Sequence, residues 1–287
     1  MEFSKEILVY DLCLLANFIF ILWLSKLINN WLTPYCVNDQ ISAKDNPALC
    51  ISITGYFIAV AIIFISSMLG PELLELNKTT IYKDLEMTTL YGLLGIILLN
   101  FSRVINDKFI LYKFSNVKEI IEDRNSGTGV VQFASYVASG LMIGAAIHGE
   151  GGGIKTVLAF FVLGQIALIL FSIIYNLFTP FDTHDEIEKD NIAAGVCLAG
   201  YLLALGIIIH RASLGDFYSW KENLTTFISV VLMALILLPL NRWVFNRILL
   251  SKASLKDEIC TDKNIGVALI DASCALMIAG FFSFLMA

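Results

Sequence analysis

The sequence contains little charge and little proline. Of its 287 residues, 15% are Asp, Glu, Lys or Arg and 57% are hydrophobic, and there are 5 prolines. A water-soluble domain of this length needs more polar surface, and a disordered chain has fewer apolar residues. The formal net charge of −6 leaves no basic surface that could neutralise phosphates. The composition therefore also excludes a nucleic-acid-binding protein, so no nucleic acid is expected as a partner.

The chain also lacks the residue patterns of metal and catalytic sites. Its six cysteines stand apart, without a C-x-x-C pair, so neither a zinc site nor a disulfide framework is indicated. The three histidines make no ligand set with them, and no Ser-His-Asp, Cys-His or paired-carboxylate spacing suits catalysis. We therefore expect no metal, no cofactor and no enzymatic activity.

Long apolar runs are what the sequence does contain. A transmembrane helix needs about 20 mainly apolar residues to cross about 30 Å of hydrocarbon. No basic segment precedes the first run and no small-residue cleavage site follows it, so it is predicted to span the membrane rather than to act as a signal peptide. We expect an all-α integral membrane protein, in contact with the lipid bilayer, with eight transmembrane helices. The predicted spans are residues 7–31, 47–70, 85–104, 127–146, 154–178, 192–210, 224–245 and 265–287.

The distribution of Lys and Arg predicts the orientation. Thirteen of the 19 basic residues lie in or beside the connections from odd-numbered to even-numbered spans. Basic residues favour the cytoplasmic side, so we expect both termini outside the cytoplasm of a multi-pass protein of the bacterial inner membrane. Two of the cytoplasmic loops, residues 106–124 and 242–263, are long and charged.

The two halves of the chain repeat one another. The segment from Thr33 to Tyr56 recurs, 146 and then 145 residues later, as the segment from Thr179 to Tyr201. A weaker match relates residues 125–134 to residues 264–273 at a separation of 139. The pattern predicts two tandem four-helix membrane repeats, each made of two hairpins, with all four hairpins oriented alike. The predicted repeats are residues 1–148 and 149–287.

One segment carries a family resemblance. Residues 179–195, T-P-F-D-T-H-D-E-I-E-K-D-N-I-A-A-G, resemble the uncharacterised bacterial inner-membrane family typified by YjfL, a domain of unknown function. The similarity covers nearly the whole chain as two tandem copies, with departures at Pro47, Lys263 and Asp271. The family is found beside phage-shock-type peripheral proteins and ligases related to glutathionylspermidine synthesis. The resemblance therefore implies a role in envelope stress but no known reaction.

Each even-numbered span begins with an asparagine, at Asn46, Asn125, Asn191 and Asn264. Asparagine is a favoured N-cap because its side chain accepts a hydrogen bond from a free amide of the first helical turn. The alternative is that four helix N-termini gather at the cytoplasmic face and bind an anion or a phosphorylated headgroup. The sequence is compatible with both interpretations.

The even-numbered spans also carry small residues at spacings of three and four, whereas the odd-numbered spans carry bulky ones. Small residues let helix backbones approach closely where lipid provides no hydrophobic driving force. We expect an inner set of even-numbered helices that odd-numbered helices surround and separate from lipid. The same small-residue faces could instead join copies of the chain into a homo-oligomer.

The clearest ionisable group inside a span is Asp271, which the repeat aligns with Gln132. A charged side chain at this depth is costly, and no Lys or Arg is evident in the sequence at the depth of Asp271 to neutralise it. Asp271 and Gln132 are therefore the candidates for a polar pathway. Binding of a proton or cation and a structural hydrogen bond remain alternatives for Asp271.

Three functions follow from these observations. The first is a channel-like or transporter-like pathway for a small solute or ion, based on Asp271 and Gln132. The second is a membrane scaffold or envelope-stress partner that recruits a cytosolic peripheral protein to residues 106–124 and 242–263. The third, an intramembrane enzyme, has the least support because the sequence shows no nucleophile or metal cluster.

Overall fold

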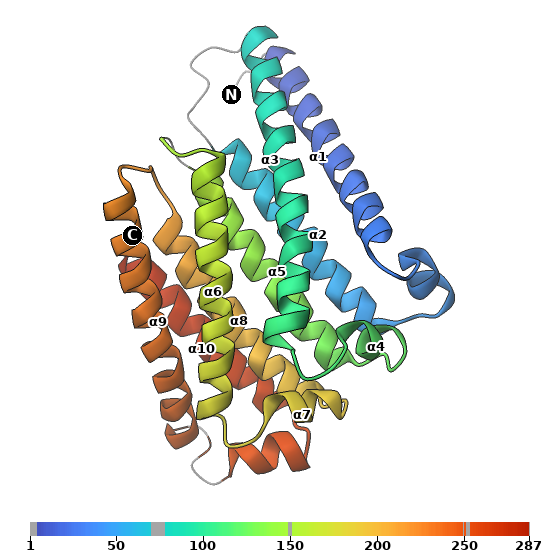
Figure 1. The fold of residues 1–287 in the computed structure, drawn as a ribbon, viewed down its shortest axis with the longest axis vertical. Helices are drawn as coiled ribbons and strands as arrows, with labels where there is room; N and C mark the ends of the chain where they lie inside the picture. The colour runs from blue at the N-terminus through green and yellow to red at the C-terminus, as the bar shows by residue number, and fades with distance from the viewer. Residues whose placement is uncertain (1–4, 70–77, 149–150, 249, 251–252, 287) are drawn as a thin grey trace.

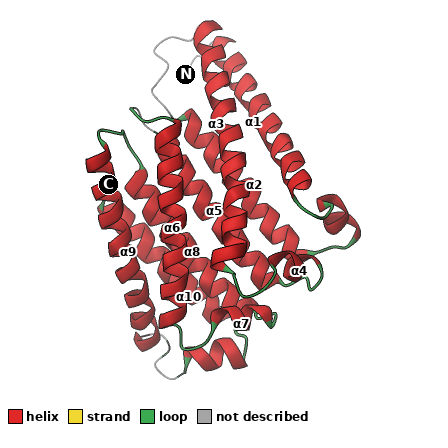
Figure 2. Ribbon diagram, in the orientation of Figure 1, coloured by secondary structure: helices red, strands yellow, loops and turns green. Residues whose placement is uncertain are grey.

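The computed structural model describes residues 5–69, 78–148, 151–248, 250 and 253–286. The described part of the chain is helical and contains no strand (Figure 2). Eight helices are long and apolar enough to cross a membrane, which confirms the predicted class. They are α1 (Lys5–Leu32), α2 (Pro47–Met68), α3 (Lys78–Ile105), α5 (Ser126–Ile147), α6 (Ile154–Phe178), α8 (Ile192–Ser213), α9 (Trp220–Ile248) and α10 (Ile265–Leu285).

Two helices extend well beyond their predicted spans. Helix α3 begins at Lys78 rather than at residue 85, and α9 runs from Trp220 to Ile248. Polar side chains explain part of the extension of α3, because the Tyr10 hydroxyl of α1 donates a hydrogen bond to Asp84 at 2.5 Å. The predicted span ends at residues 70 and 287 lie outside the described residues.

Short helices connect the long ones at the end where α2, α5, α8 and α10 begin. Two are α-helical and three are π-helical, and their side chains pack beneath the long helices. They are η1 (Asp39–Ala43), η2 (Asn106–Ile110), α4 (Asn116–Ile121), α7 (Thr183–Glu188) and η3 (Asp257–Thr261).

Helices α2, α5, α8 and α10 form a row in that order and run parallel (Figure 1). Their backbones approach closely at small residues. A Cβ atom at Gly129 of α5 would lie 2.5 Å from the carbonyl oxygen of Ala48, and one at Gly195 of α8 would lie 2.5 Å from that of Gly127. Larger side chains at these two glycines would separate the helices, so glycine is required for this packing.

The other four long helices, α1, α3, α6 and α9, form a second layer on one face of the row (Figure 1). The expectation that they surround the row is therefore wrong. The row is shielded on one side, and on its other face Val130 and Val137 of α5 remain partly exposed. The fold is a two-layer assembly of helices in which the row is the tightly packed layer.

The apolar core divides along the sequence repeat. One buried cluster joins α1, α2, α3 and part of α5, and includes Ile63, Ile96 and Ile143. The other joins α6, α8, α9, α10 and the remaining face of α5. Helix α5 contributes to both clusters, as does α6 through Val157 and Phe161, so these two helices link the repeats.

Candidate functional site

The four asparagines predicted to cap helices do so. The side-chain oxygens of Asn46, Asn125, Asn191 and Asn264 each accept a hydrogen bond from the backbone N–H three positions along, at 3.1–3.3 Å. The residue before each asparagine has φ between 46° and 57°, so the same left-handed turn leads into all four helices. The sequence repeat is thus a repeat of local backbone geometry.

The side-chain amides of three of these asparagines are also fully used inside the protein. Each donates one hydrogen bond to a side chain of the preceding short helix and one, at 2.6–2.7 Å, to a backbone carbonyl leading into the next helix of the row. Asn46, Asn125 and Asn191 are fully buried. Their side chains therefore cap one helix and bind it to the next, which leaves no amide hydrogen for an external anion.

Asp271 of α10 lies in a buried polar cluster. Its carboxylate is 3.6 Å from the Arg242 guanidinium, and the two side chains are 0% and 4% exposed. The Tyr201 hydroxyl donates to Asp271 at 3.1 Å, and Arg242 donates to the Thr179 hydroxyl at 2.9 Å. The expectation that Asp271 has no cationic neighbour is wrong, because α9 continues to Ile248 and holds Arg242 inside the bundle.

Aromatic rings complete the surroundings of this ion pair. The Arg242 guanidinium carbon lies 4.4 Å from the ring centre of Tyr175 and 5.5 Å from that of Tyr201. A desolvated guanidinium is attracted to ring faces, so the two tyrosines partly replace its lost hydration. The cluster is closed and opposite charges face each other in it, but Asp271 Oδ2 and the Arg242 Nε and Nη2 atoms have no hydrogen-bond partner among the described residues. Asp271 is absent from the linings of both hollows described below.

The first repeat arranges the equivalent positions differently. Gln132, the counterpart of Asp271, accepts a hydrogen bond from the Ser52 hydroxyl at 2.5 Å and donates one to Asp107 at 3.4 Å. Arg103, the counterpart of Arg242, is half-buried and donates to the carbonyl of Leu32 at 3.0 Å. Here the carboxylate near the arginine is that of Asp107, which is half-buried and makes no ion pair with Arg103 within the described residues.

A small hollow of about 80 Å³ opens beside Gln132. Since one water molecule occupies about 30 Å³ in the liquid, the hollow has room for two or three. It lies near the N-terminal end of α5, between the last turn of α3, the segment after α1, and α4. Its polar lining includes Arg103, Asp107, Asn116 and Gln132.

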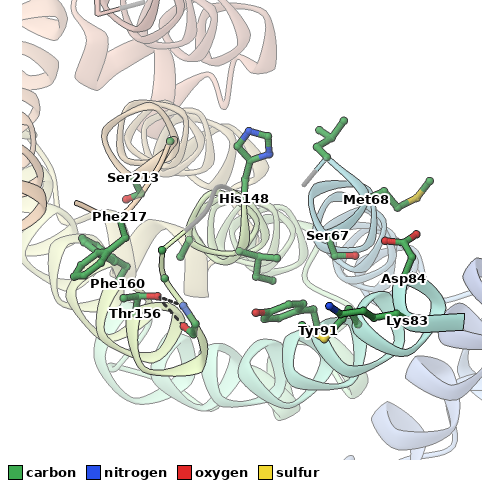
Figure 3. Close-up of a pocket in the computed structure, with 18 of the residues that line it drawn as sticks. Ser67, Met68, Lys83, Asp84, Tyr91, His148, Thr156, Phe160, Ser213 and Phe217 are labelled. Atoms are coloured by element: carbon green, nitrogen blue, oxygen red, sulfur yellow. Dashed lines mark hydrogen bonds between the residues drawn. The ribbon is translucent and has the colours of Figure 1, made fainter. Parts of the chain in front are cut away.

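A much larger cavity, of about 1140 Å³, opens at the opposite end of the bundle (Figure 3). It lies among the C-terminal ends of α2, α5 and α8 and the N-terminal parts of α1, α3, α6 and α9. Lys83, Asp84 and Tyr91 lie on one side of it, and Phe160 and Phe217 on the other (Figure 3). No single sequence motif marks this cavity, because its lining comes from seven helices.

One face of α5 runs from the small hollow to the large cavity. Gln132 lines the first and Ile147 the second, with Tyr136 and Ile143 between them at helical spacing. Tyr136 and Ile143 are 3% and 0% exposed. At 1.5 Å of rise per residue, Gln132 and Ala146, the nearest lining residues of the two hollows on α5, are about 21 Å apart. The two hollows are thus separated by a closed, mainly apolar layer, and residues of both repeats line the larger one.

The loop at residues 106–124, one of two predicted to bind a cytosolic protein, makes contacts within the chain. Lys113 forms ion pairs with Asp182 at 2.5 Å and Asp185 at 2.8 Å, joining the first repeat to α7. These hydrogen bonds raise the pKa of Lys113. Burial raises the pKa of Asp182, but the hydrogen bonds from Lys113 and from two backbone N–H groups outweigh it and lower that pKa. Part of the second loop, at residues 249 and 251–252, lies outside the described residues.

The described residues contain neither a disulfide nor a cluster of side chains suited to binding a metal ion. The six cysteines are free, and no group of three or more His, Cys, Asp or Glu side chains lies close enough to hold a metal ion. Cys197 is buried and forms a hydrogen bond with Asp271, so it belongs to the cluster of the second repeat.

Comparison with known proteins confirms the tandem organisation. The family described as Domain of Unknown Function (DUF350) matches the chain twice, at residues 6–147 and 151–286. A UPF0719 transmembrane protein of Aquifex aeolicus (strain VF5) is 23% identical over 224 residues, which cover 75% of this chain and 79% of that protein. No solved structure matches the chain.

Proposed function

We propose that this chain, which belongs to the family described as Domain of Unknown Function (DUF350), forms a gated pathway for a small polar solute or ion through its first repeat. The observation that carries the proposal is the pair of hollows at opposite ends of one face of α5. A path through this repeat needs the closed layer between them, about 21 Å along α5, to open.

The layer between the hollows has the composition of a closed gate. Ile63 of α2, Ile96 of α3 and Ile143 of α5 are almost completely buried and pack together. A narrow apolar constriction excludes water and so blocks ions and polar solutes without a plug. Gly95 of α3, where an added Cβ would meet Ile63, lets α2 and α3 pack closely at this level. Small separations of α2, α3 and α5 would therefore wet the layer.

The linings of the two hollows indicate the class of solute. The small hollow holds one basic and one acidic group, Arg103 and Asp107, and the large cavity includes Lys83, Asp11 and Asp84. Groups of both signs line each end, with one more acidic than basic group in the large cavity, so neither sign is strongly favoured. The volume of about 80 Å³ limits the solute to a few non-hydrogen atoms or a partly hydrated ion.

Asp271 has a different role in this proposal from Gln132. Gln132 lines the small hollow and lies on the face of α5 that leads to the gate. Asp271 is held by Arg242 and Tyr201 and so anchors α9 and α10 to α8. The pathway therefore runs beside Gln132, and the second repeat provides a fixed support.

The orientation is part of the same proposal. The ends of the row that carry the four asparagines face the cytoplasm of a bacterial inner membrane, because most Lys and Arg residues lie at that end. The small hollow then faces the cytoplasm and the large cavity faces outside. Fusion of a reporter that is active only in the cytoplasm, placed after residue 115 or after residue 153, tests this orientation.

A substitution in the gate tests the pathway. Ile143→Ser should hydrate the layer and raise permeation at least tenfold over the wild-type protein. The measurement uses purified protein in proteoliposomes, with potassium conductance and glycerol-driven swelling as the two probes. The matched control is Phe282→Ser, since Phe282 of α10 occupies the equivalent position in the second repeat.

Three outcomes are informative. Greater permeation for Ile143→Ser but not for Phe282→Ser supports a path through the first repeat. Equal increases would show that the second repeat conducts as well, and would contradict the proposed route. Folded, monodisperse Ile143→Ser that permeates neither probe above protein-free liposomes would contradict a pathway.

A further inference from the structure

The row of parallel helices ends with an unfilled position at each edge. We propose that α10 of one copy packs against α2 of a second copy of this chain, so that the row continues from copy to copy in a head-to-tail manner. The occupant of the exposed α10 face is thus the same chain. The argument rests on a series of hydrogen bonds and on the register of helix contacts, both of which stop at α10.

The hydrogen-bond series has three members inside the chain. In each, the asparagine that caps one helix donates to the backbone carbonyl of an isoleucine in the short helix that precedes the next helix of the row. These bonds join Asn46 to Ile120 at 2.7 Å, Asn125 to Ile187 at 2.6 Å and Asn191 to Ile259 at 2.7 Å.

The fourth asparagine lacks this partner within the described residues. The Asn264 amide donates only to Glu258 at 2.8 Å, and its side chain is partly exposed, whereas the other three are fully buried. The sequence repeat aligns Ile187 with Ile41 of η1. Ile41 is half-buried, whereas Ile120, Ile187 and Ile259 are 0–2% exposed. The carbonyl of Ile41 in a second copy would complete the series.

The helix contacts follow a fixed register counted from the capping asparagine. The second residue after it on one helix lies against the fourth on the next, as Ala48 does against Gly129 and Gly127 against Gly195. On α10 the second residue is Gly266, which is exposed. On α2 the fourth residue is Cys50, which is half-buried where its equivalents are buried.

The middle and far ends of the helices obey the same rule. Counted from the capping asparagine, the ninth residue of one helix lies against the eighth residue of the next helix. The thirteenth residue of one helix lies against the fifteenth residue of the next. The rule therefore places Ser273 against Thr54, and Met277 against Ala61, of a second copy. Ser273, Met277 and Thr54 are exposed and Ala61 is half-buried. The internal pairs are Gly55 with Phe133, Gly200 with Ala272, Ala59 with Gly140 and Ala138 with Gly206.

Helix α1 shows the same unfilled edge in the second layer. Its repeat counterpart α6 buries Phe161 and Gln165 against the first repeat, and Gln165 donates to Ser139 of α5 at 2.9 Å. The equivalent residues of α1, Leu15 and Ile19, are 53% and 58% exposed. A preceding copy would cover them, just as the first repeat covers α6.

The geometry of the proposed contact limits the assembly. Two different faces meet, so the interface is heterologous and continues until it closes into a ring. Because all four helices of the row run parallel, successive copies must keep the same orientation across the membrane. A closed assembly therefore has its rotation axis along the membrane normal.

Cysteine cross-linking in native membranes tests the proposal. In a chain whose six cysteines are replaced by alanine or serine, Thr54→Cys and Ser273→Cys are introduced together and oxidised. We expect a ladder of cross-linked species on denaturing gels. Co-expression of chains that carry only Thr54→Cys with chains that carry only Ser273→Cys should give dimers and nothing larger.

The controls separate this contact from random collision and from a symmetric dimer. Ile97→Cys combined with Ser273→Cys pairs the same α10 position with an exposed residue of α3, and should cross-link at background level. Dimers from Ser273→Cys alone would overturn the head-to-tail geometry, because two identical faces would then meet. A double variant that cross-links no better than the Ile97→Cys control would also overturn it.

A second measurement does not depend on the cysteine-free chain. Native mass spectrometry of the wild-type protein should show oligomers, and Ser273→Trp should shift them to monomer, whereas Ser273→Ala should not. The side chain at residue 273 is exposed in the single chain, so tryptophan there leaves the fold intact. A monomeric wild-type protein in mild detergent and in lipid nanodiscs would overturn the proposal.

Discussion

The two repeats share one backbone plan and differ in where they put their carboxylate. In the second repeat Asp271 faces Arg242 and forms a buried ion pair. In the first repeat the equivalent of Asp271 is Gln132, and the acidic group is Asp107, at the end of α3. The carboxylate thus stands at a different position in each repeat. The second repeat has a closed cluster there, and the first repeat has a hollow.

The comparison shows how a duplicated membrane unit can divide its tasks. A buried charge in a low-dielectric interior must be paired, and pairing closes the space around it. A neutral amide at the same position needs only ordinary hydrogen bonds, so the neighbouring arginine can remain half-exposed. The second repeat is thereby a rigid support and the first repeat retains room for water.

Removal of Arg242 should produce the largest effect. Arg242→Ala leaves Asp271 buried without its counter-charge, which should lower the free energy of unfolding by about 3–5 kcal/mol. The equivalent change Arg103→Ala should cost about 1 kcal/mol or less, because Arg103 is half-buried and bonds only to a carbonyl. Thermal unfolding of both variants in the same detergent compares them directly.

A double substitution sharpens this result. Replacing both Arg242 and Asp271 with leucine removes the pair without leaving a lone charge, and should restore most of the stability lost in Arg242→Ala. If the double variant is as unstable as the single one, the cost arises from lost packing and the ion pair is not its origin.

Tyr56 and Tyr201 stand at equivalent positions of the two repeats, and replacing them should give a smaller difference in stability. Tyr201→Phe removes a hydrogen bond to the charged Asp271 and should cost about 1.5–3 kcal/mol. Tyr56→Phe removes a bond to the neutral carbonyl of Ser25 and one from the neutral amide of Asn100, at 3.3 Å, and should cost about 0.5–1.5 kcal/mol. Thermal unfolding again provides the measure, and equal losses would contradict the difference between the clusters.

The link between the repeats should give the smallest effect, with a characteristic pH dependence. Lys113→Gln removes the ion pairs to Asp182 and Asp185. The pKa of Asp182 is lowered below its ordinary value of 3.8, so this carboxylate stabilises the fold above about pH 4, and the contribution is lost as the pH falls through the lowered pKa. The pKa of Lys113 is raised above 10.5, so its contribution persists until the pH rises through that raised value.

The measurement is the difference in melting temperature between wild type and Lys113→Gln across the pH range. It should be small and constant from about pH 5 to about pH 9, and should disappear in stronger acid. Lys113→Arg, which keeps the charge, serves as the control. A difference that persists unchanged below about pH 3 would show that the lysine acts through packing.

The sequence was sufficient for the class, the eight spans, the tandem repeat and the capping asparagines, because these depend on local composition and short-range patterns. Arg242 was counted with the charged loop at residues 242–263, although the predicted span 224–245 includes it, because a single basic residue near the end of a span gives no hydropathy signal for burial. Its pairing with Asp271 joins different helices and becomes visible only in three dimensions. The large cavity is equally non-local, since residues of seven helices line it.

Alignment of the repeats could have revealed more than hydropathy did. The separation of 139 residues that relates Gln132 to Asp271 also relates Arg103 to Arg242. Two arginines at equivalent positions, one turn or two before a polar loop, indicate a shared structural role. The exchange of Asp107 and Gln132 for Asn246 and Asp271 follows from the same alignment.

Water access to the equivalent positions of the two repeats tests the central claim most directly. Native Cys197 lies beside Asp271, and Gln132→Cys places a thiol at the small hollow of the first repeat, in a background in which the other five native cysteines are replaced. A charged, membrane-impermeant thiol reagent is applied to vesicles of either orientation. The account predicts rapid labelling of residue 132 from the side that carries the capping asparagines, and no labelling of Cys197 until the protein unfolds. Labelling of Cys197 at a similar rate, or protection of both thiols, would contradict it.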